Sequence, residues 1–165
     1  MNMRNLVAAV AALCLLGVTS GCSLLGFGGS PRDPDGEVTA SQNVDAFSLR
    51  VGDCIISSEL DENFSEVPVV PCTQPHDAEI YYLFDMPGDT FDEEAATEAA
   101  REVCPEMIEE YVGPNWAYIA SEGLGAAWFL PTDDTWKRGD REVDCVAYTV
   151  SGENELTSSV KDMGR

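Results

Sequence analysis

The chain has 165 residues and carries 30 acidic against 9 basic side chains, a formal net charge of −21. A surface this acidic lacks the clustered cations that displace counterions from phosphates, so we exclude nucleic acid as a partner. The length allows one small domain in addition to a leader.

The first 21 residues have the three parts of a bacterial export signal. A cation, Arg4, precedes an apolar stretch over residues 6–18, and small residues lead up to Cys22. The apolar stretch has 13 residues, whereas a membrane-spanning helix needs about 20. We therefore predict a signal peptide over residues 1–21 that is removed in front of Cys22.

Cys22 follows Val18-Thr19-Ser20-Gly21, a setting typical of the cysteine that carries lipid in bacterial lipoproteins. Several acyl chains such as palmitate would hold the protein firmly, because a single chain gives only marginal binding. We predict a lipid anchor on Cys22 at the outer, extracytoplasmic face of the cell membrane. The alternative is plain secretion after a nearby cut. The acidic domain itself should not bind anionic headgroups.

Residues 22–45 contain much Gly, Ser, Pro and Asp and few large apolar residues, which predicts a flexible tether. Within it, residues 33–37 resemble the start of a calcium loop. The glycine stands at the fourth place instead of the sixth, so no metal site is predicted there. We expect the folded domain over residues 46–160 and a tail over 161–165.

Apolar residues alternate with polar ones over residues 47–56, 66–72 and 78–85, which predicts three strands. Gly52-Asp53 interrupts the first strand as a turn or bulge. Pro68 and Pro71 favour an edge or bulged position for the second strand. In the third, Ile80, Tyr82 and Phe84 are expected on one face.

A helix is predicted from Thr90 to Tyr111, because Thr90 and Glu93 have capping-box spacing and apolar residues recur every three or four positions. Pro105 predicts a kink or the start of a second helix, and Gly113 ends the segment. The expected buried stripe consists of Ala96, Ala100, Val103, Met107 and Tyr111.

Two further strands are predicted over residues 126–131 and 142–150, joined by a loop over 132–141. In the last strand, Val143, Cys145 and Ala147 share one side. The elements together predict an α+β fold, a small antiparallel sheet with one long or kinked helix packed on one face.

Beyond Cys14 and Cys22 the chain has four cysteines, and an even number in a small exported domain predicts two disulfides with three possible connectivities. They are Cys54, Cys72, Cys104 and Cys145. Their wide spacing lacks the C-x-x-C pairs of a zinc site. Closeness of the first two strands favours Cys54–Cys72, and a helix covering the last strand favours Cys104–Cys145.

His76 is the only histidine, and Pro75, His76 and Asp77 form a tight turn that could contact a ligand. A hydrolase also needs a nucleophile, and no serine lies in a Gly-x-Ser-x-Gly elbow. We therefore predict no catalytic residue, metal or cofactor, with the turn capping itself. Trp128 and Trp136, with Trp116, could line a binding groove or belong to the core.

Several of these motifs resemble the bacterial septum formation domain family. Its first half is matched by Val51-Gly52-Asp53-Cys54, Val69-Val70-Pro71-Cys72 and Pro75-His76-Asp77-Ala78-Glu79, and its second by Gly139-Asp140-Arg141 and Val143-Asp144-Cys145. The resemblance covers residues 47–160. It implies an actinobacterial cell-surface protein with a division role, and a shared disulfide frame. Family members are often held by a transmembrane helix.

No activity is attached to that family, so the resemblance carries over no catalytic residue. We expect a non-catalytic, lipid-anchored binding module that contacts an unknown envelope protein or wall component. The alternatives are an envelope hydrolase that uses His76 with an acidic partner, and a lipoprotein that binds a small ligand.

Overall fold

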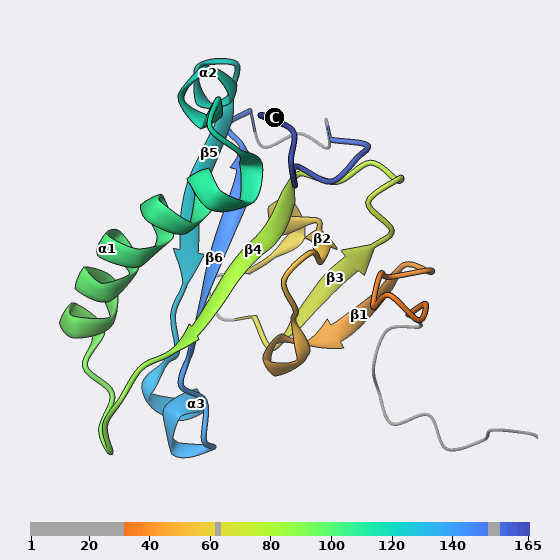
Figure 1. The fold of residues 1–165 in the computed structure, drawn as a ribbon. Helices are drawn as coiled ribbons and strands as arrows, with labels where there is room; N and C mark the ends of the chain where they lie inside the picture. The colour runs from red at the N-terminus through yellow and green to blue at the C-terminus, as the bar shows by residue number, and fades with distance from the viewer. Residues whose placement is uncertain (1–31, 62–63, 152–155) are drawn as a thin grey trace, which may run out of the picture.

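A computed structural model describes residues 32–61, 64–151 and 156–165. The predicted signal peptide, Cys22 and the first part of the predicted tether lie outside the described residues. Six antiparallel strands form one sheet in the order β1-β3-β2-β4-β6-β5 (Figure 1). The strands are β1 Gln42–Asp45, β2 Cys54–Ile55, β3 Glu66–Val70, β4 Ala78–Asp85, β5 Leu124–Phe129 and β6 Glu142–Thr149.

A long helix, α1, lies across β4, β6 and β5 on one face of the sheet (Figure 1). The helices are α1 Glu93–Val112, α2 Trp116–Ser121 and α3 Asp133–Lys137, with short 3-10 turns η1 Ala46–Ser48 and η2 Ser57–Glu59. The predicted α+β class, with one long helix on an antiparallel sheet and two disulfides, is confirmed.

The sheet separates two apolar cores. On the helix face, Ala100, Ile108 and Val112 pack with Val143 and other buried residues of β6. On the opposite face, the second core contains Val44, Ile55, Val67, Val69, Ile80 and Val146. The alternation predicted for the last strand is therefore confirmed, with Val143, Cys145 and Ala147 facing the helix.

Helix α1 is capped at its N-terminus by Asp92, whose side chain accepts a hydrogen bond from the Ala95 N–H at 3.0 Å. The predicted Thr90 cap is thus two residues early. The buried stripe of the helix consists of Ala96, Ala100, Cys104, Ile108 and Val112. The prediction was wrong after Ala100, because each later buried residue lies one position after the predicted Val103, Met107 and Tyr111. The reason is that the disulfide to Cys145 turns Cys104 toward the sheet. Pro105 lies inside one continuous helix, and Gly113 ends it with a positive φ of 115°.

The domain begins before the predicted residue 46, so the tether prediction is wrong for its second half. Strand β1 pairs with β3, and Val38 and Val44 are buried. The predicted strand over 47–56 is reduced to the two residues of β2, because Phe47 and Val51 are exposed. At the other end, the Gly164 N–H donates to the Val112 carbonyl at 2.8 Å, so residues 161–165 pack on the end of α1 rather than forming a loose tail.

Two details of the sheet differ from the prediction, the position of β3 and the register of β4. Strand β3 lies between β1 and β2 rather than at an edge. Pro68 is tolerated there because β2 pairs only with Val69 and Val70 and ends before it. In β4 the register shifts between Ile80 and Tyr82. This irregularity places Ile80 in the core away from the helix and Tyr82 against the helix-side core, instead of on one shared face.

Both favoured disulfides are confirmed. Cys54–Cys72 joins the end of the Gly52 turn to the residues after β3, and Cys104–Cys145 joins α1 to β6, with Cα–Cα distances of 5.2 and 5.5 Å. The region predicted as a loop over 132–141 contains the short helix α3, capped by Thr132 and Thr135. Arg138 and Gly139 then form a turn into the last strand, with a φ of 101° at Gly139.

Candidate functional site

In the Pro75-His76-Asp77 turn, Pro75 is exposed, whereas His76 and Asp77 are buried inside the domain. His76 is 0% exposed, and its ring Nδ1 lies 2.8 Å from the Gln74 carbonyl oxygen. Because that partner can only accept, Nδ1 carries the hydrogen. The His76 backbone exchanges two hydrogen bonds of 3.0 Å with Leu156, so the turn also holds the C-terminal segment.

Asp77 serves as the cap of a neighbouring turn. Its carboxylate accepts hydrogen bonds from the Ser57 and Ser58 N–H groups at the start of η2. The N-cap residue of η2, Ile56, makes no capping hydrogen bond with its own side chain. A carboxylate bonded to the free N–H groups of a helix start stabilises that turn. The structure thus places Asp77 in a structural role.

Glu79 is a polar centre that the sequence reading did not identify. It is 0% exposed and accepts hydrogen bonds from the Tyr111 hydroxyl at 2.6 Å, the Ser159 hydroxyl at 2.7 Å and the Val160 N–H at 2.7 Å. Burial first, and then the nearby Glu79 carboxylate, raise the pKa of Tyr111 above its ordinary value. Glu79 therefore joins β4, α1 and the C-terminal segment.

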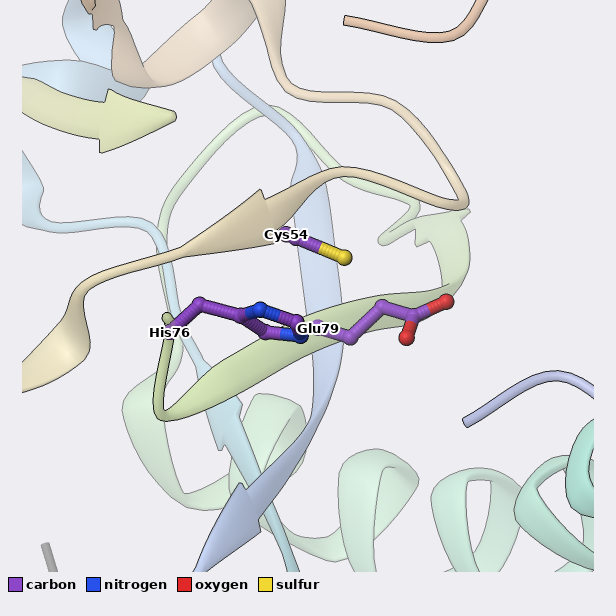
Figure 2. Close-up of side chains that lie close together, drawn as sticks. All are labelled: Cys54, His76 and Glu79. Carbon is purple, nitrogen blue, oxygen red and sulfur yellow. The ribbon is translucent and has the colours of Figure 1, made fainter. Parts of the chain in front are cut away.

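Cys54, His76 and Glu79 place potential metal-ligand atoms within 4.8 Å of one another (Figure 2). Cys54 is bonded to Cys72 and cannot act as a thiolate ligand while that disulfide is intact. The Glu79 oxygens are already occupied by hydrogen bonds. This group therefore does not fit a metal ion, although the His76 Nε2 has no hydrogen-bond partner among the described residues.

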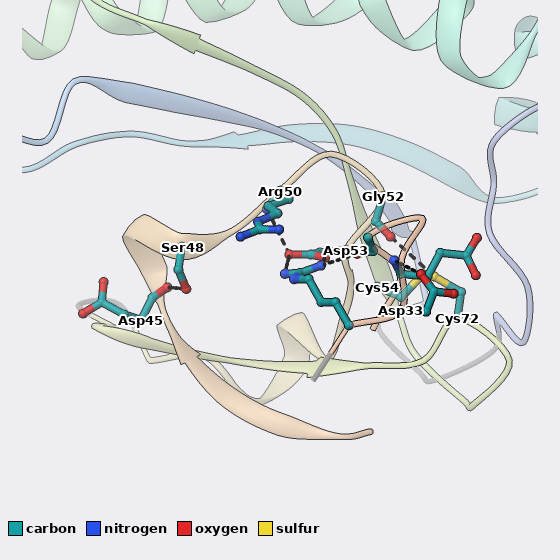
Figure 3. A network of polar contacts seen from close by, with 11 residues as sticks. Asp33, Asp45, Ser48, Arg50, Gly52, Asp53, Cys54 and Cys72 are labelled. Carbon is teal, nitrogen blue, oxygen red and sulfur yellow. Dashed lines mark hydrogen bonds and ion pairs between the residues drawn. A yellow bond between two sulfur atoms is a disulfide. The ribbon is translucent and has the colours of Figure 1, made fainter. Parts of the chain in front are cut away.

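Asp53, in the Gly52-Asp53-Cys54 turn, holds the predicted tether to the domain. Its carboxylate is bound by two nitrogens of Arg32 and by the Arg50 N–H (Figure 3). Asp53 is 1% exposed, and its hydrogen bond to Arg32 raises the pKa of that guanidinium. A bidentate arginine–carboxylate pair is the stronger kind of ion pair. This turn is also structural.

A pocket of about 250 Å³ lies on the sheet face opposite α1, and we call it the acidic–aromatic pocket. It is lined by two kinds of residue, the aromatic residues Phe47, Phe64, Trp128 and Phe129 and the acidic residues Asp140, Glu142 and Asp144; Trp128 also packs against the helix-side core. Trp128, one of the predicted ligand contacts, is thus placed at a pocket. Trp136 is buried in α3 beside Phe91, and Trp116 packs against the helix-side core, so the three tryptophans do not share one groove.

Asp144 is 8% exposed, and its carboxyl group has no hydrogen-bond partner among the described residues. Burial, followed by the charges of Glu142 and Asp140, raises the pKa of Asp144 to about 8. The pKa of Glu142 is raised as well, by burial and then by Asp85 and Asp140. The sequence signal for this site was weak, since outward-facing polar residues on an alternating strand are ordinary.

A model of the septum formation family matches residues 18–145, which is most of the chain. The chain belongs to the septum formation family. The resemblance seen in the motifs is therefore confirmed. The Gly-Asp-Cys turn, both disulfides and the Pro75-His76-Asp77 turn of this septum formation domain form the structural frame described above.

No curated protein and no solved structure matches this septum formation protein. Family membership connects it with cell division and the cell envelope. Within the described part of the chain, we find no helix with the length and apolar character required to cross a membrane.

Proposed function

We propose that this septum formation protein is a non-catalytic binding module of the cell envelope, held on the outer face of the cell membrane by lipid on Cys22. The proposal rests on the burial and the hydrogen bonds of three residues of the family motif. His76, Asp77 and Glu79 are all buried, and each donates or accepts structural hydrogen bonds. Residues with such roles support a rigid domain rather than a reaction.

The anchor prediction supports the outer location. The segment before Cys22 has the composition of an export signal, and two disulfides are typical of exported domains. The formal charge of −21 disfavours direct contact with anionic lipid. The lipid would therefore keep the domain near the membrane while its surface remains available to an envelope protein or wall component.

Replacement of Cys22 by Ala tests the proposal in cells. We expect Cys22→Ala to move the protein from the membrane fraction to the soluble fraction and to abolish both its labelling by a palmitate analogue and its enrichment at septa. Cys14→Ala is the matched control, since it removes a cysteine from the predicted leader and should leave all three readouts unchanged. Full membrane retention of the Cys22→Ala protein would overturn the anchor.

The alternative is an envelope hydrolase that uses His76 with an acidic partner. Asp77 and Glu79 are the acids nearest to His76 in the sequence, and both are engaged elsewhere.

A further inference from the structure

We propose that the acidic–aromatic pocket binds a primary ammonium group at the end of an alkyl chain, as in the lysyl side chain of a peptide. This inference deepens the proposed function, on which it rests, by naming the chemistry that the binding module recognises.

The pocket contains a buried carboxyl group without a partner. Asp144 is more than nine-tenths buried and lines the pocket, and no hydrogen bond to its side chain is found in the described residues. Its carboxyl oxygens are not among the fully buried atoms that lack a hydrogen-bond partner, so they are open to the pocket. A ligand that donates hydrogen bonds can therefore reach Asp144 from the pocket.

The carboxyl groups also lack neutralising cations. The ion pairs of the described residues involve Asp53, Asp134 and Asp162, and none involves Asp140, Glu142 or Asp144. Two arginines close to Asp140 in the sequence are engaged with aromatic rings, Arg138 at 5.1 Å from the centre of Phe47 and Arg141 at 3.9 Å from that of Trp136. The pocket therefore favours a cation supplied from outside.

The aromatic walls select an organic cation over a metal ion. Calcium and magnesium require several oxygen ligands at short range. Among the described residues, the only group of ligand atoms close enough to hold a metal is the Cys54 cluster, so the carboxyl groups of the pocket do not converge. Aromatic rings attract ammonium groups through their faces. Arg138 already makes such a contact with Phe47 at the rim.

The size of the pocket fits one side chain. Pockets for drug-sized ligands measure about 300–1,000 Å³, and this one is smaller, at about 250 Å³. Phe64 and Phe129 stack edge to face with their ring centres 5.0 Å apart, and both also line a second, more apolar pocket. Leu60, Val146 and Tyr148 line this second pocket too. A peptide could thus place its amine beside Asp144 and continue along the sheet.

Binding should release a proton. Asp144 has a pKa of about 8, so it is mostly neutral at pH 7, whereas an ammonium group favours its charged form. The charged groups around it are Asp140 and Glu142 in the pocket and Arg138 and Arg141 outside it. We expect the affinity to increase up to about tenfold for each unit by which the pH rises toward pH 8, and to level off above pH 8.

The test is calorimetric titration of the full-length protein, purified in detergent, with Nα-acetyl-lysine methylamide between pH 6.5 and 9. The matched probe is the same molecule acetylated at Nε, which has no charge. We expect the charged probe to bind at least about tenfold more tightly, and close to one proton to be released at pH 7 in buffers of different ionisation enthalpy.

Variants locate the site. Asp144→Asn should weaken binding about tenfold or more, and Phe47→Ala, at an exposed rim position, a few fold. Asp134→Asn changes the same charge on the exposed surface of α3 and should leave affinity within twofold.

Equal binding of both probes, or unchanged binding by Asp144→Asn and Phe47→Ala, would overturn the proposal. Either failure leaves the Cys22 result intact, so it is distinguishable from failure of the proposed anchor.

Discussion

Two buried carboxyl groups of this septum formation protein, Glu79 on β4 and Asp144 on β6, have opposite surroundings. Glu79 lies on the helix side and accepts three hydrogen bonds. Asp144 lies on the other face, beside two further acids and without a hydrogen-bond partner in the described part of the chain. A satisfied buried carboxylate stabilises a fold, whereas an unsatisfied one weakens it unless a ligand binds. The comparison separates the structural frame from the candidate binding surface.

The largest effect is expected at Glu79. Glu79→Ala leaves the Tyr111 hydroxyl, the Ser159 hydroxyl and the Val160 N–H without their acceptor. The Val160 N–H is buried and the two hydroxyls are half-buried, and a buried group left without a partner costs about 1–3 kcal/mol. We predict a loss of about 4 kcal/mol in the free energy of unfolding, measured by urea denaturation. Tyr111→Phe is the control and should cost about 1 kcal/mol. A loss below 1 kcal/mol for Glu79→Ala would show that this carboxylate is not a structural centre.

A smaller loss is expected at His76. His76→Ala removes the bond to the Gln74 carbonyl and leaves a cavity in a fully buried site. We predict a loss of about 2 kcal/mol in the free energy of unfolding, and any loss of septal function should follow the lower protein level. An unchanged free energy of unfolding together with lost function would instead support the hydrolase alternative.

The sequence predicted the elements whose signals are local. Strand β4 and helix α1 have strong periodicity. The two disulfides follow from the number of cysteines, the closeness of the first two strands and a helix that covers the last strand. The N-terminal part was misread because its order depends on distant contacts. Arg32 pairs with Asp53, 21 residues away, and β1 needs β3 to pair with. Composition alone therefore indicated a tether.

The candidate site was predictable only in fragments. Pro75, His76 and Asp77 stood out in the sequence, but their structural role depends on the distant residues Ser57 and Leu156. Glu79 resembled an outward-facing acid on an alternating strand, since its partners Ser159 and Val160 are 80 and 81 residues away. The pocket likewise needs Phe47 and Phe64 to be folded over β6. Spacing within one segment cannot reveal such contacts.

Asp144→Asn gives the most direct test of the contrast between the two carboxyl groups. Folding raises the pKa of Asp144 from 3.8 to about 8, so the folded state holds more protons than the unfolded state between those values. The contribution of this group to stability is therefore full below pH 4, falls by at most about 1.4 kcal/mol per pH unit, and levels off above pH 8.

The decisive measurement is the free energy of unfolding of Asp144→Asn and of the unchanged protein at pH 5 and pH 8. Asparagine cannot ionise, so we expect the variant to lose less stability than the unchanged protein between the two pH values and to be the more stable protein at pH 8. A variant that is less stable at pH 8, with the same pH dependence as the unchanged protein, would contradict the account, because Asp144 would then belong to the structural frame.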